Sequence, residues 1–224
     1  MRTKSILAVT MAVGSLWAAT SSANAAAYTF TQIDVPGSIV TSATGINNAG
    51  QVVGFFQSTN DRGFLDTGGS FTQIDVPGAF DTIANGINNA GQIVGNFSNS
   101  TGTHGFLDTG GSLTQIDVPG SSATNPTGIN DAGQIVGGFD MNHGFLDTGG
   151  VFTQIDVPGP FVTIVRGIND NGEIVGSFED SAERGHGFIA TPVSAVPEPS
   201  SLALFGIGVI GLGLFHQRRR RYPR

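Results

Sequence analysis

Three histidines recur at equivalent places in the chain and are the first residues that could bind a metal ion. His104, His143 and His186 each precede a Gly-Phe pair, and Arg62 takes the corresponding place nearer the N-terminus. Imidazole is a common zinc ligand, but a zinc site needs its ligands together in one small coordination sphere. Successive copies of a repeated segment carry one such residue each. We therefore expect a hydrogen bond to a neighbouring turn at each position, with no metal and no cofactor.

Asparagine and aspartate also gather in turns, where their oxygen atoms could bind calcium. None of these turns has the alternating carboxylates of a calcium-binding loop, and such side chains usually bond the backbone of their own turn. A second recurring set of aspartates is expected on a solvated outer face. The turn residues are Asn47, Asn48, Asn88, Asn89, Asn130, Asp131, Asn169 and Asp170, and the outer set is Asp34, Asp75, Asp117 and Asp156.

Catalysis would require polar residues that depart from the repeat. Paired carboxylates such as Glu173 and Glu183 could exchange protons with a substrate, but no nucleophile or oxyanion site accompanies them. We interpret these residues as surface ion pairs and expect no enzymatic activity, with a hydrolase as the remote alternative. The residues that break the repeat are Asp81, Asn142, Arg166, Glu173, Glu183 and Arg184.

The body of the chain is built from four copies of one segment. TQIDVPG follows Phe30, Phe71, Leu113 and Phe152, at spacings of 41, 42 and 39 residues. Each unit contains the segments GIN, then QVVG, QIVG or EIVG, and then Gly-Phe followed by a hydrophobic residue. Three units end in TQIDV. An Asn-x-x-Gly turn begins at the asparagine of GIN, and in three units a Gly-Gly turn precedes TQIDV. Four short antiparallel strands in about 40 residues are typical of a propeller blade.

The ends of the array indicate how the units would close. The last unit begins at Gly167, stops after HGFIATPV and lacks a TQIDV strand, whereas a spare one precedes the first unit, from Tyr28 onward. This predicts an all-β fold, a four-bladed β-propeller in which the N-terminal strand completes the last blade and leaves no unpaired edge. A body closed in this way is expected to be soluble and monomeric.

Charge and composition limit the ligands of this body. Residues 26–195 carry sixteen acidic and three basic side chains, a net charge of −13, which makes nucleic-acid binding untenable. The chain has no cysteine, so no disulfide framework is expected. Sugar sites usually offer Trp or Tyr as platforms, but this span has no Trp and only Tyr28. A structural or interaction role is favoured, with binding of an exopolysaccharide as the alternative.

The N-terminus has the features of a secretory signal peptide. Arg2 and Lys4 precede an apolar run from residue 6 to residue 19, and Ala23 and Ala25 fit an A-x-A cleavage site. We therefore divide the chain into a signal peptide (residues 1–25), a repeat body (26–195) and a tail (196–224).

The tail combines a Pro-Glu-Pro triplet, an apolar segment and a block of arginines. Residues 202–215 are uninterrupted apolar sequence, near the short limit for a transmembrane helix. The arginines that follow would keep that end in the cytoplasm. Two prolines hold the triplet extended and accessible to a protease. The triplet is Pro197, Glu198 and Pro199, and the cytoplasmic anchor is Arg218, Arg219, Arg220 and Arg221.

Two family resemblances rest on these segments. GINNAGQIVG…HGFLDTGG resembles the HAF family of extracellular repeats, although Gly105, Gly144 and Gly187 replace the alanine of that family and Arg62 replaces a histidine. Residues 196–221 resemble the PEP-CTERM sorting signal. The second resemblance implies that an exosortase processes the protein after transient anchoring in the inner membrane. The protein would then reach the cell surface or the extracellular matrix of a biofilm.

Overall fold

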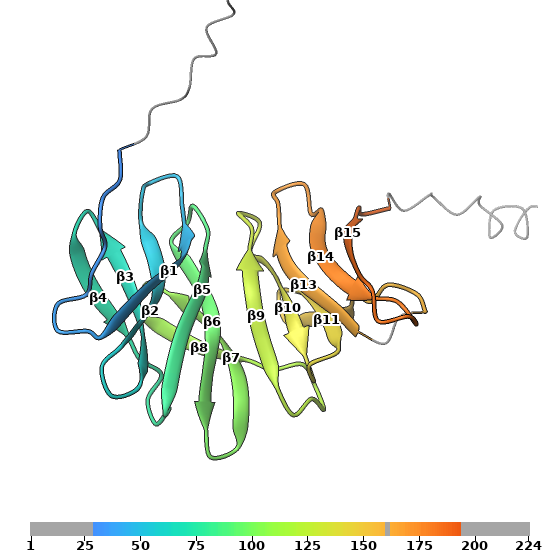
Figure 1. Ribbon diagram of the computed structural model, residues 1–224, viewed down its shortest axis with the longest axis horizontal. Helices are drawn as coiled ribbons and strands as arrows, with labels where there is room; N and C mark the ends of the chain where they lie inside the picture. The colour runs from blue at the N-terminus through green and yellow to red at the C-terminus, as the bar shows by residue number, and fades with distance from the viewer. Residues whose placement is uncertain (1–28, 160–161, 194–224) are drawn as a thin grey trace, which may run out of the picture. The chain divides into compact units, whose positions relative to one another are not determined.

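The computed structural model describes residues 29–159 and 162–193, and the chain divides into two units, residues 1–32 and 33–224. Residues 29–32, the described part of the first unit, have no regular secondary structure. The described part of the second unit contains fifteen strands in four antiparallel sheets, which follow one another in chain order (Figure 1). These described residues include no helix long and apolar enough to cross a membrane.

Each sheet is a meander in which consecutive strands pair. The first contains β1 (Val40–Ile46), β2 (Val52–Gln57), β3 (Asp61–Thr67) and β4 (Ser70–Ile74). The second contains β5 (Asp81–Ile87), β6 (Gln92–Asn99), β7 (Gly102–Thr109) and β8 (Ser112–Ile116). The third contains β9 (Thr124–Ile129), β10 (Gln134–Phe139), β11 (His143–Thr148) and β12 (Val151–Gln154), and the fourth contains β13 (Val162–Ile168), β14 (Ile174–Glu179) and β15 (Gly185–Ala190).

Glycines in left-handed conformations make the hairpins tight. In the turn between β5 and β6, Gly91 has a φ of +76° and its N–H donates to the carbonyl of Asn88 (3.1 Å). Between β3 and β4, Gly68 and Gly69 both have positive φ values of 62° and 89°. Two consecutive residues of this kind are typical of a type I′ turn, whose twist matches that of the flanking strands.

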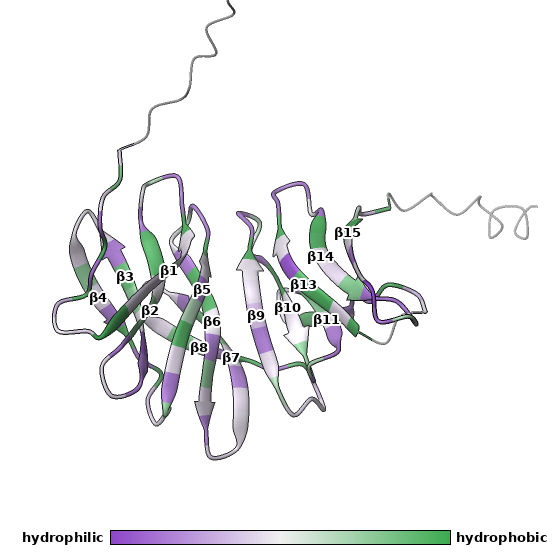
Figure 2. Cartoon of the chain, in the orientation of Figure 1, coloured by the Kyte–Doolittle hydropathy of each residue, from purple (hydrophilic) through white to green (hydrophobic). Residues whose placement is uncertain are grey.

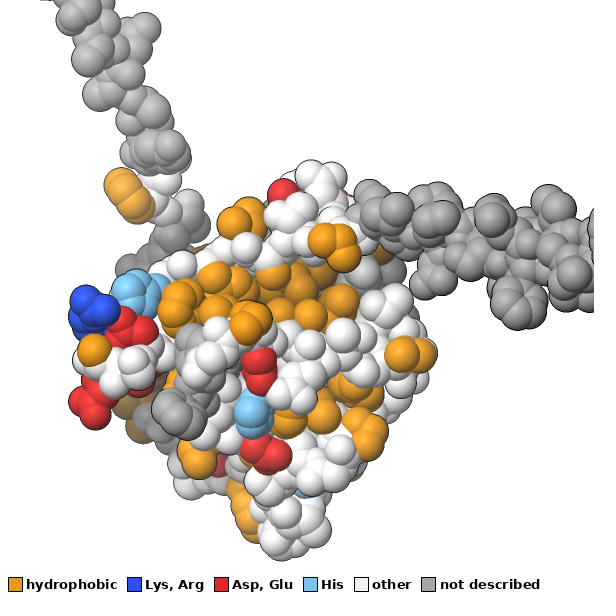
Figure 3. Space-filling model, turned by 90° about the vertical axis from the view of Figure 1, so that its right-hand side faces the viewer, with side chains coloured by type: hydrophobic (Ala, Val, Ile, Leu, Met, Phe, Trp, Pro, Cys, Tyr) orange, Lys and Arg blue, Asp and Glu red, His pale blue; other side chains and the backbone are white. Residues whose placement is uncertain are grey.

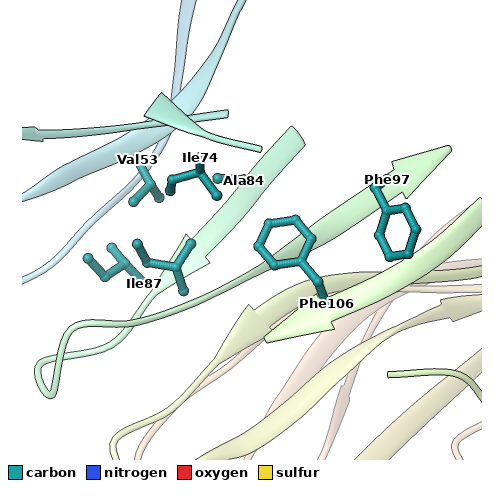
Figure 4. Packing of buried hydrophobic residues seen from close by; sticks show 7 residues of the cluster. Val53, Ile74, Ala84, Ile87, Phe97 and Phe106 are labelled. Carbon is teal, nitrogen blue, oxygen red and sulfur yellow. The ribbon is translucent and has the colours of Figure 1, made fainter. Parts of the chain in front are cut away.

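Hydrophobic side chains fill the space between consecutive sheets. We call the face of a sheet that meets the following sheet its front face, and the opposite one its rear face. Between the first two sheets, Val53 and Ile74 of the front face pack against Ile87 and Phe106 of the next rear face (Figure 4). Hydrophobic and polar residues alternate along the strands (Figure 2), as expected when adjacent side chains point to opposite faces.

The first strands of consecutive units approach each other closely at glycine. In each of these strands the pairing register skips the residue just before the glycine of GIN, as expected for a β-bulge. A Cβ atom added to Gly45 would lie 3.3 Å from the Cα of Gly86, and one added to Gly128 would lie 3.3 Å from the Cα of Gly167. The sheets can stack at this spacing because no side chain stands there.

The structure corrects the prediction of a closed propeller. The fourth sheet has three strands, and the N-terminal TQIDV segment does not pair with β15. Instead, Ile33 and Val35 pack on the rear face of the first sheet, against Val52 and Phe64. The four sheets form an open row among the described residues. The predicted signal peptide and transmembrane helix lie outside those residues.

The N-terminal DVPG segment makes the same local contact as its counterparts in later units. The backbone N–H of Val35 donates to Thr41 Oγ1 (3.1 Å), as the N–H of Val76 donates to Thr82 Oγ1 (3.2 Å) at the start of the second sheet. Each DVPG segment is thus held by the sheet that follows it in the chain. The N-terminal segment obeys the same rule, so its apolar residues pack on the first sheet. The ring stays open because the last sheet packs on the third sheet and does not stack on the rear face of the first.

Candidate functional sites

The recurring histidines pair with recurring aspartates within their own units. His104 Nδ1 lies 2.9 Å from Asp117 Oδ2, and His143 Nδ1 lies 2.7 Å from Asp156 Oδ2. His104 also contacts Thr101 of the adjacent turn, which was the type of partner expected from the sequence (2.8 Å). Each aspartate follows the strand that pairs beside the histidine strand, so the two side chains are brought together by the sheet register.

The remaining two units vary this pair. Arg62 takes the histidine position and its Nη1 lies 3.3 Å from Asp75 Oδ1. His186, in the unit without a TQIDV strand, instead contacts Asp180 Oδ2 (3.1 Å), which also accepts from Arg184 (2.7 Å). Asp75, Asp117 and Asp156 of the second aspartate set keep about a third of their side-chain surface exposed, and the sheet register also places a basic side chain beside each of them.

Hydrogen bonds set the charge state of two of these aspartates. Burial raises the pKa of Asp156, but hydrogen bonds from Gln154, the Gly144 N–H and His143 outweigh it and hold the pKa below its ordinary value. The pKa of Asp180 is held far below its usual range, chiefly by Arg184 and then by His186. Both carboxylates are ionised at neutral pH, and each serves as an acceptor for its basic neighbour.

The histidines do not converge on one site. They lie in different sheets, on β7, β11 and β15, and within the described ranges no three His, Cys, Asp or Glu side chains form a group able to hold a metal ion. Their other contacts are aromatic: the His143 ring stacks on Phe139 with centroids 5.2 Å apart. The geometry is that of a repeated structural pair.

The turn asparagines do more than the sequence indicated, because they connect the units to one another. Asn88 Oδ1 accepts from the N–H groups of Ala90 and Gln92 in its own turn (3.1 and 2.9 Å). Its Nδ2 donates to Gln92 Oε1 (2.8 Å) and to the carbonyl of Asn130 in the next unit (3.1 Å). Asn47 and Asn130 repeat both kinds of bond, so a ladder of asparagines runs through the array.

The next residue of each turn adds a second ladder. The N–H of Asn48 donates to Asn89 Oδ1 (2.8 Å), that of Asn89 to Asp131 Oδ1 (2.8 Å), and that of Asp131 to Asp170 Oδ1 (2.9 Å). The signal in the sequence was the constant position of these residues, since equivalent residues of stacked units lie beside each other. In these contacts the side-chain oxygen atoms accept from backbone N–H groups and are not gathered around a common point as calcium ligands would be.

The residues that differ from the repeat make their contacts at separate places in the structure. Asp81 accepts from the N–H of Asp61 (3.1 Å) and from Ser98 Oγ (3.2 Å), and Glu173 accepts from Asn169 Nδ2 (2.7 Å). Glu183 lies in a turn with a φ of +58°. Among the described residues, no hydrogen bond or ion pair joins Glu173 to Glu183.

A pocket of about 420 Å³ lies between the third and fourth sheets. It opens at Gly138, where the preceding units carry Phe55 or Asn96. Its polar lining comes from both sheets and from the turn after β10, and the residues at its wall include Asn125, Thr127, Asp140, His143 and Arg166. Its aromatic lining is Phe139, with no Tyr or Trp among the described wall residues.

Comparison with known protein families identifies one motif in the tail. Residues 195–220 match the PEP-CTERM protein-sorting motif. This sorting motif implies export to the cell surface and recognition by an exosortase. The matched range includes the Pro197-Glu198-Pro199 triplet and the arginines from 218 to 220, which all lie outside the described residues. No curated protein sequence matches the chain.

Proposed function

We propose that this protein is an exported, non-catalytic surface or matrix protein that an exosortase cuts at its C-terminal sorting motif. On this proposal the apolar segment after the Pro-Glu-Pro triplet anchors the chain in the inner membrane until processing, and the signal peptide starts its export. The match of residues 195–220 to the sorting motif is the observation that carries the proposal.

A structural or interaction role for the body is supported by how its polar side chains are used. The histidines, the turn asparagines and the recurring aspartates bond one another or the backbone, at distances of 2.7–3.3 Å. Groups engaged in this way hold sheets together, and in the part of the chain that the structure describes they do not form an assembled set of catalytic side chains. The resemblance of the units to HAF repeats agrees with an extracellular role.

The pocket at Gly138 favours one secondary function, binding of an exopolysaccharide. Asn125, His143 and Arg166 at its wall could donate and accept hydrogen bonds, although the wall lacks the flat Tyr or Trp that sugar sites prefer. A change of Gly138 to Phe should remove binding to polysaccharide from the producing cells. A change of Val151 to Ser, the residue found at the equivalent position in two other units, should leave that binding intact.

The sorting role is tested by the location of full-length variants in the producing cells. Pro197→Ala combined with Glu198→Ala should leave the protein in the inner membrane fraction at its unprocessed size. Pro223→Ala, a proline beyond the matched range, is the matched control and should be exported normally. Recovery of the doubly changed protein outside the cell in normal amounts would contradict the sorting proposal.

A further inference from the structure

The two end sheets of the row expose the same surfaces that meet at every internal junction. On the front face, Val53, Val94 and Val136 have no exposed surface, whereas the equivalent Val175 of the last sheet is 46% exposed. Ile189, next to it on β15, is 63% exposed. Figure 3 looks onto this end and shows hydrophobic side chains gathered there.

The rear face of the first sheet is the complementary surface. Ile87 and Ile129 are 8% and 9% exposed because the preceding sheet covers them, whereas the equivalent Ile46 is 68% exposed. Ala43 is also exposed, although Ala84 at the same position of the second sheet is completely buried. One copy of the chain thus carries both halves of a junction, one at each end of its row.

We propose that copies of this protein associate head to tail, with the N-terminal FTQI strand of one copy completing the last sheet of another. The strand would add to the open edge of β15, as β4 adds to β3 and β12 adds to β11. Strand addition of this kind satisfies the unpaired backbone groups of an edge. This inference goes beyond the proposed function and does not depend on it.

The register of the added strand follows from the three complete sheets. Leu65 faces Thr72, Leu107 faces Thr114 and Leu146 faces Thr153, which places Thr31 of the second copy opposite Ile189. Phe30, which is 96% exposed in the single chain, would then lie beside Phe188. The equivalent pair Phe64 and Phe71 has its ring centroids 5.8 Å apart. Phe188 is only partly buried, whereas Phe64 is completely buried.

The contacts of Ile33 and Val35 fit addition of the preceding strand to a sheet that stacks on the rear face of the first sheet. At the junction between the first two sheets, β4 belongs to one sheet while Ile74 and Val76 at its end pack in the interface with the next sheet. The N-terminal segment already makes the second set of contacts, with its own first sheet. In the complete units the strand that ends one sheet runs directly into the DVPG segment that packs on the next sheet, and the sequence from Phe30 to Gly37 has the same order. The only sheet in the described chain that lacks its fourth strand is the last one.

The polar ladders continue across the same junction. In the interior, Asn130 Nδ2 donates both to Gln134 Oε1 (2.8 Å) and to the carbonyl of the next turn (3.0 Å). Asn169 Nδ2 donates to Glu173 (2.7 Å), and its other hydrogen would reach the carbonyl of Asn47 in the second copy. An interface between different surfaces on identical copies can be extended from copy to copy, and it produces open chains unless the rotation between copies closes a ring.

The test uses the absence of cysteine from the chain, which leaves introduced thiols as the only ones. Full-length Thr31→Cys and full-length Ile189→Cys, each purified in a mild detergent, are mixed and joined with a short thiol crosslinker. We expect a crosslinked dimer from the mixture. Thr31→Cys mixed with Val151→Cys is the matched control, because Val151 is 68% exposed but lies on β12, and this mixture should give at least tenfold less dimer.

The double variant Thr31→Cys/Ile189→Cys distinguishes the alternatives within one preparation. Head-to-tail association gives a ladder of dimers, trimers and longer species on a denaturing gel. A fast-migrating monomer with both thiols consumed would show ring closure within one chain and would overturn the proposal. Equal crosslinking to Val151→Cys, or no crosslinking at either position, would overturn it as well.

A second variant tests the apolar contact without involving the strand. Val175→Asp combined with Ile189→Asp places charges on surface that is already accessible, so the fold should survive, as judged by an unchanged circular dichroism spectrum. Association measured by analytical ultracentrifugation should fall at least tenfold, whereas Val151→Asp should leave it unchanged. Unchanged association of the Val175→Asp/Ile189→Asp variant would contradict the proposed interface.

Discussion

The second and the fourth sheets have nearly the same sequence but different surroundings. Both carry an I-V-G-x-F strand and a G-F-hydrophobic strand, yet the second sheet has neighbours on both faces and the fourth has one on its rear face only. Phe106 is 1% exposed, whereas Phe188 at the same position is partly buried. Both rings lie on a rear face that another sheet covers, so the difference comes from the fourth strand, which the last sheet lacks. Burial in this molecule therefore depends on the neighbouring strands and units as much as on the residue, as expected for stacked repeats.

Truncation of these two phenylalanines should give the largest contrast. Phe106→Ala should lower the free energy of unfolding by about 3–5 kcal/mol, because it leaves a cavity in a closed interface. Phe188→Ala should cost less than half as much, since part of that ring already meets solvent. Chemical denaturation of the two variants, followed by circular dichroism, measures both effects. Equal losses would mean that the last sheet is covered in solution.

The asparagine ladder should show the same contrast at a smaller scale. Asn88→Ala removes a buried side chain with four hydrogen bonds, one of them to the next unit, and should cost about 2–3 kcal/mol. Asn169→Ala should cost about 1 kcal/mol, because the groups that it leaves unpaired lie at the exposed end and can bind water. Urea denaturation of the two variants measures both losses of stability. A larger loss for Asn169→Ala than for Asn88→Ala would contradict the prediction.

The aspartates should give the smallest effects and a dependence on pH. Asp156→Asn should reduce the free energy of unfolding at neutral pH by about 0.5–1 kcal/mol. The folded chain holds the Asp156 proton more weakly than the unfolded chain, so this contribution is present above the unfolded pKa of about 3.9 and is lost as the pH falls through the lower folded value.

Denaturation curves of the Asp156→Asn variant and the parent should therefore converge as the pH falls below 4. Asp180→Asn is the comparison: because the pKa of Asp180 is held further below its ordinary value, its contribution to the free energy of unfolding should persist to a lower pH than that of Asp156. If the parent and the Asp156→Asn variant converge at high pH instead, the assigned direction of the Asp156 pKa is wrong.

The strength of head-to-tail association should depend on salt because of the negative charge of the repeat body. Copies with a net charge of −13 repel one another, and counterions screen that repulsion over about 10 Å at 0.1 M ionic strength. Head-to-tail association should therefore strengthen as sodium chloride is raised from 20 to 300 mM, as light scattering would show. Weakening over this range would indicate that the contact is held by ion pairs and not by the apolar faces.

Local features of the fold were predictable from the sequence, because turn chemistry and strand alternation are local. The Asn-x-x-Gly and Gly-Gly segments form the predicted turns, with their glycines at positive φ. Three units have the four strands expected. The all-β class also followed from the repeat. The sorting motif could be identified because the Pro-Glu-Pro triplet, the apolar segment and the arginines occur in a fixed order.

The closure of the array could not be predicted in the same way. Whether four sheets form a ring depends on the angle between neighbouring sheets. That angle depends on packing at Gly45, Gly86 and Gly128, and the sequence does not indicate it because these residues have no side chain. The Asp–His pairs were missed for a related reason. His104 and Asp117 are thirteen residues apart in the sequence, and only the pairing of β7 with β8 brings them together.

The glycine contacts between first strands have a consequence for how such a chain can change over generations. Because each junction repeats the same close approach, apolar faces and asparagine bonds, a whole unit can be gained or lost without the need for a new kind of contact. The length of the array is therefore a variable that selection can tune separately from the sequence of any one unit.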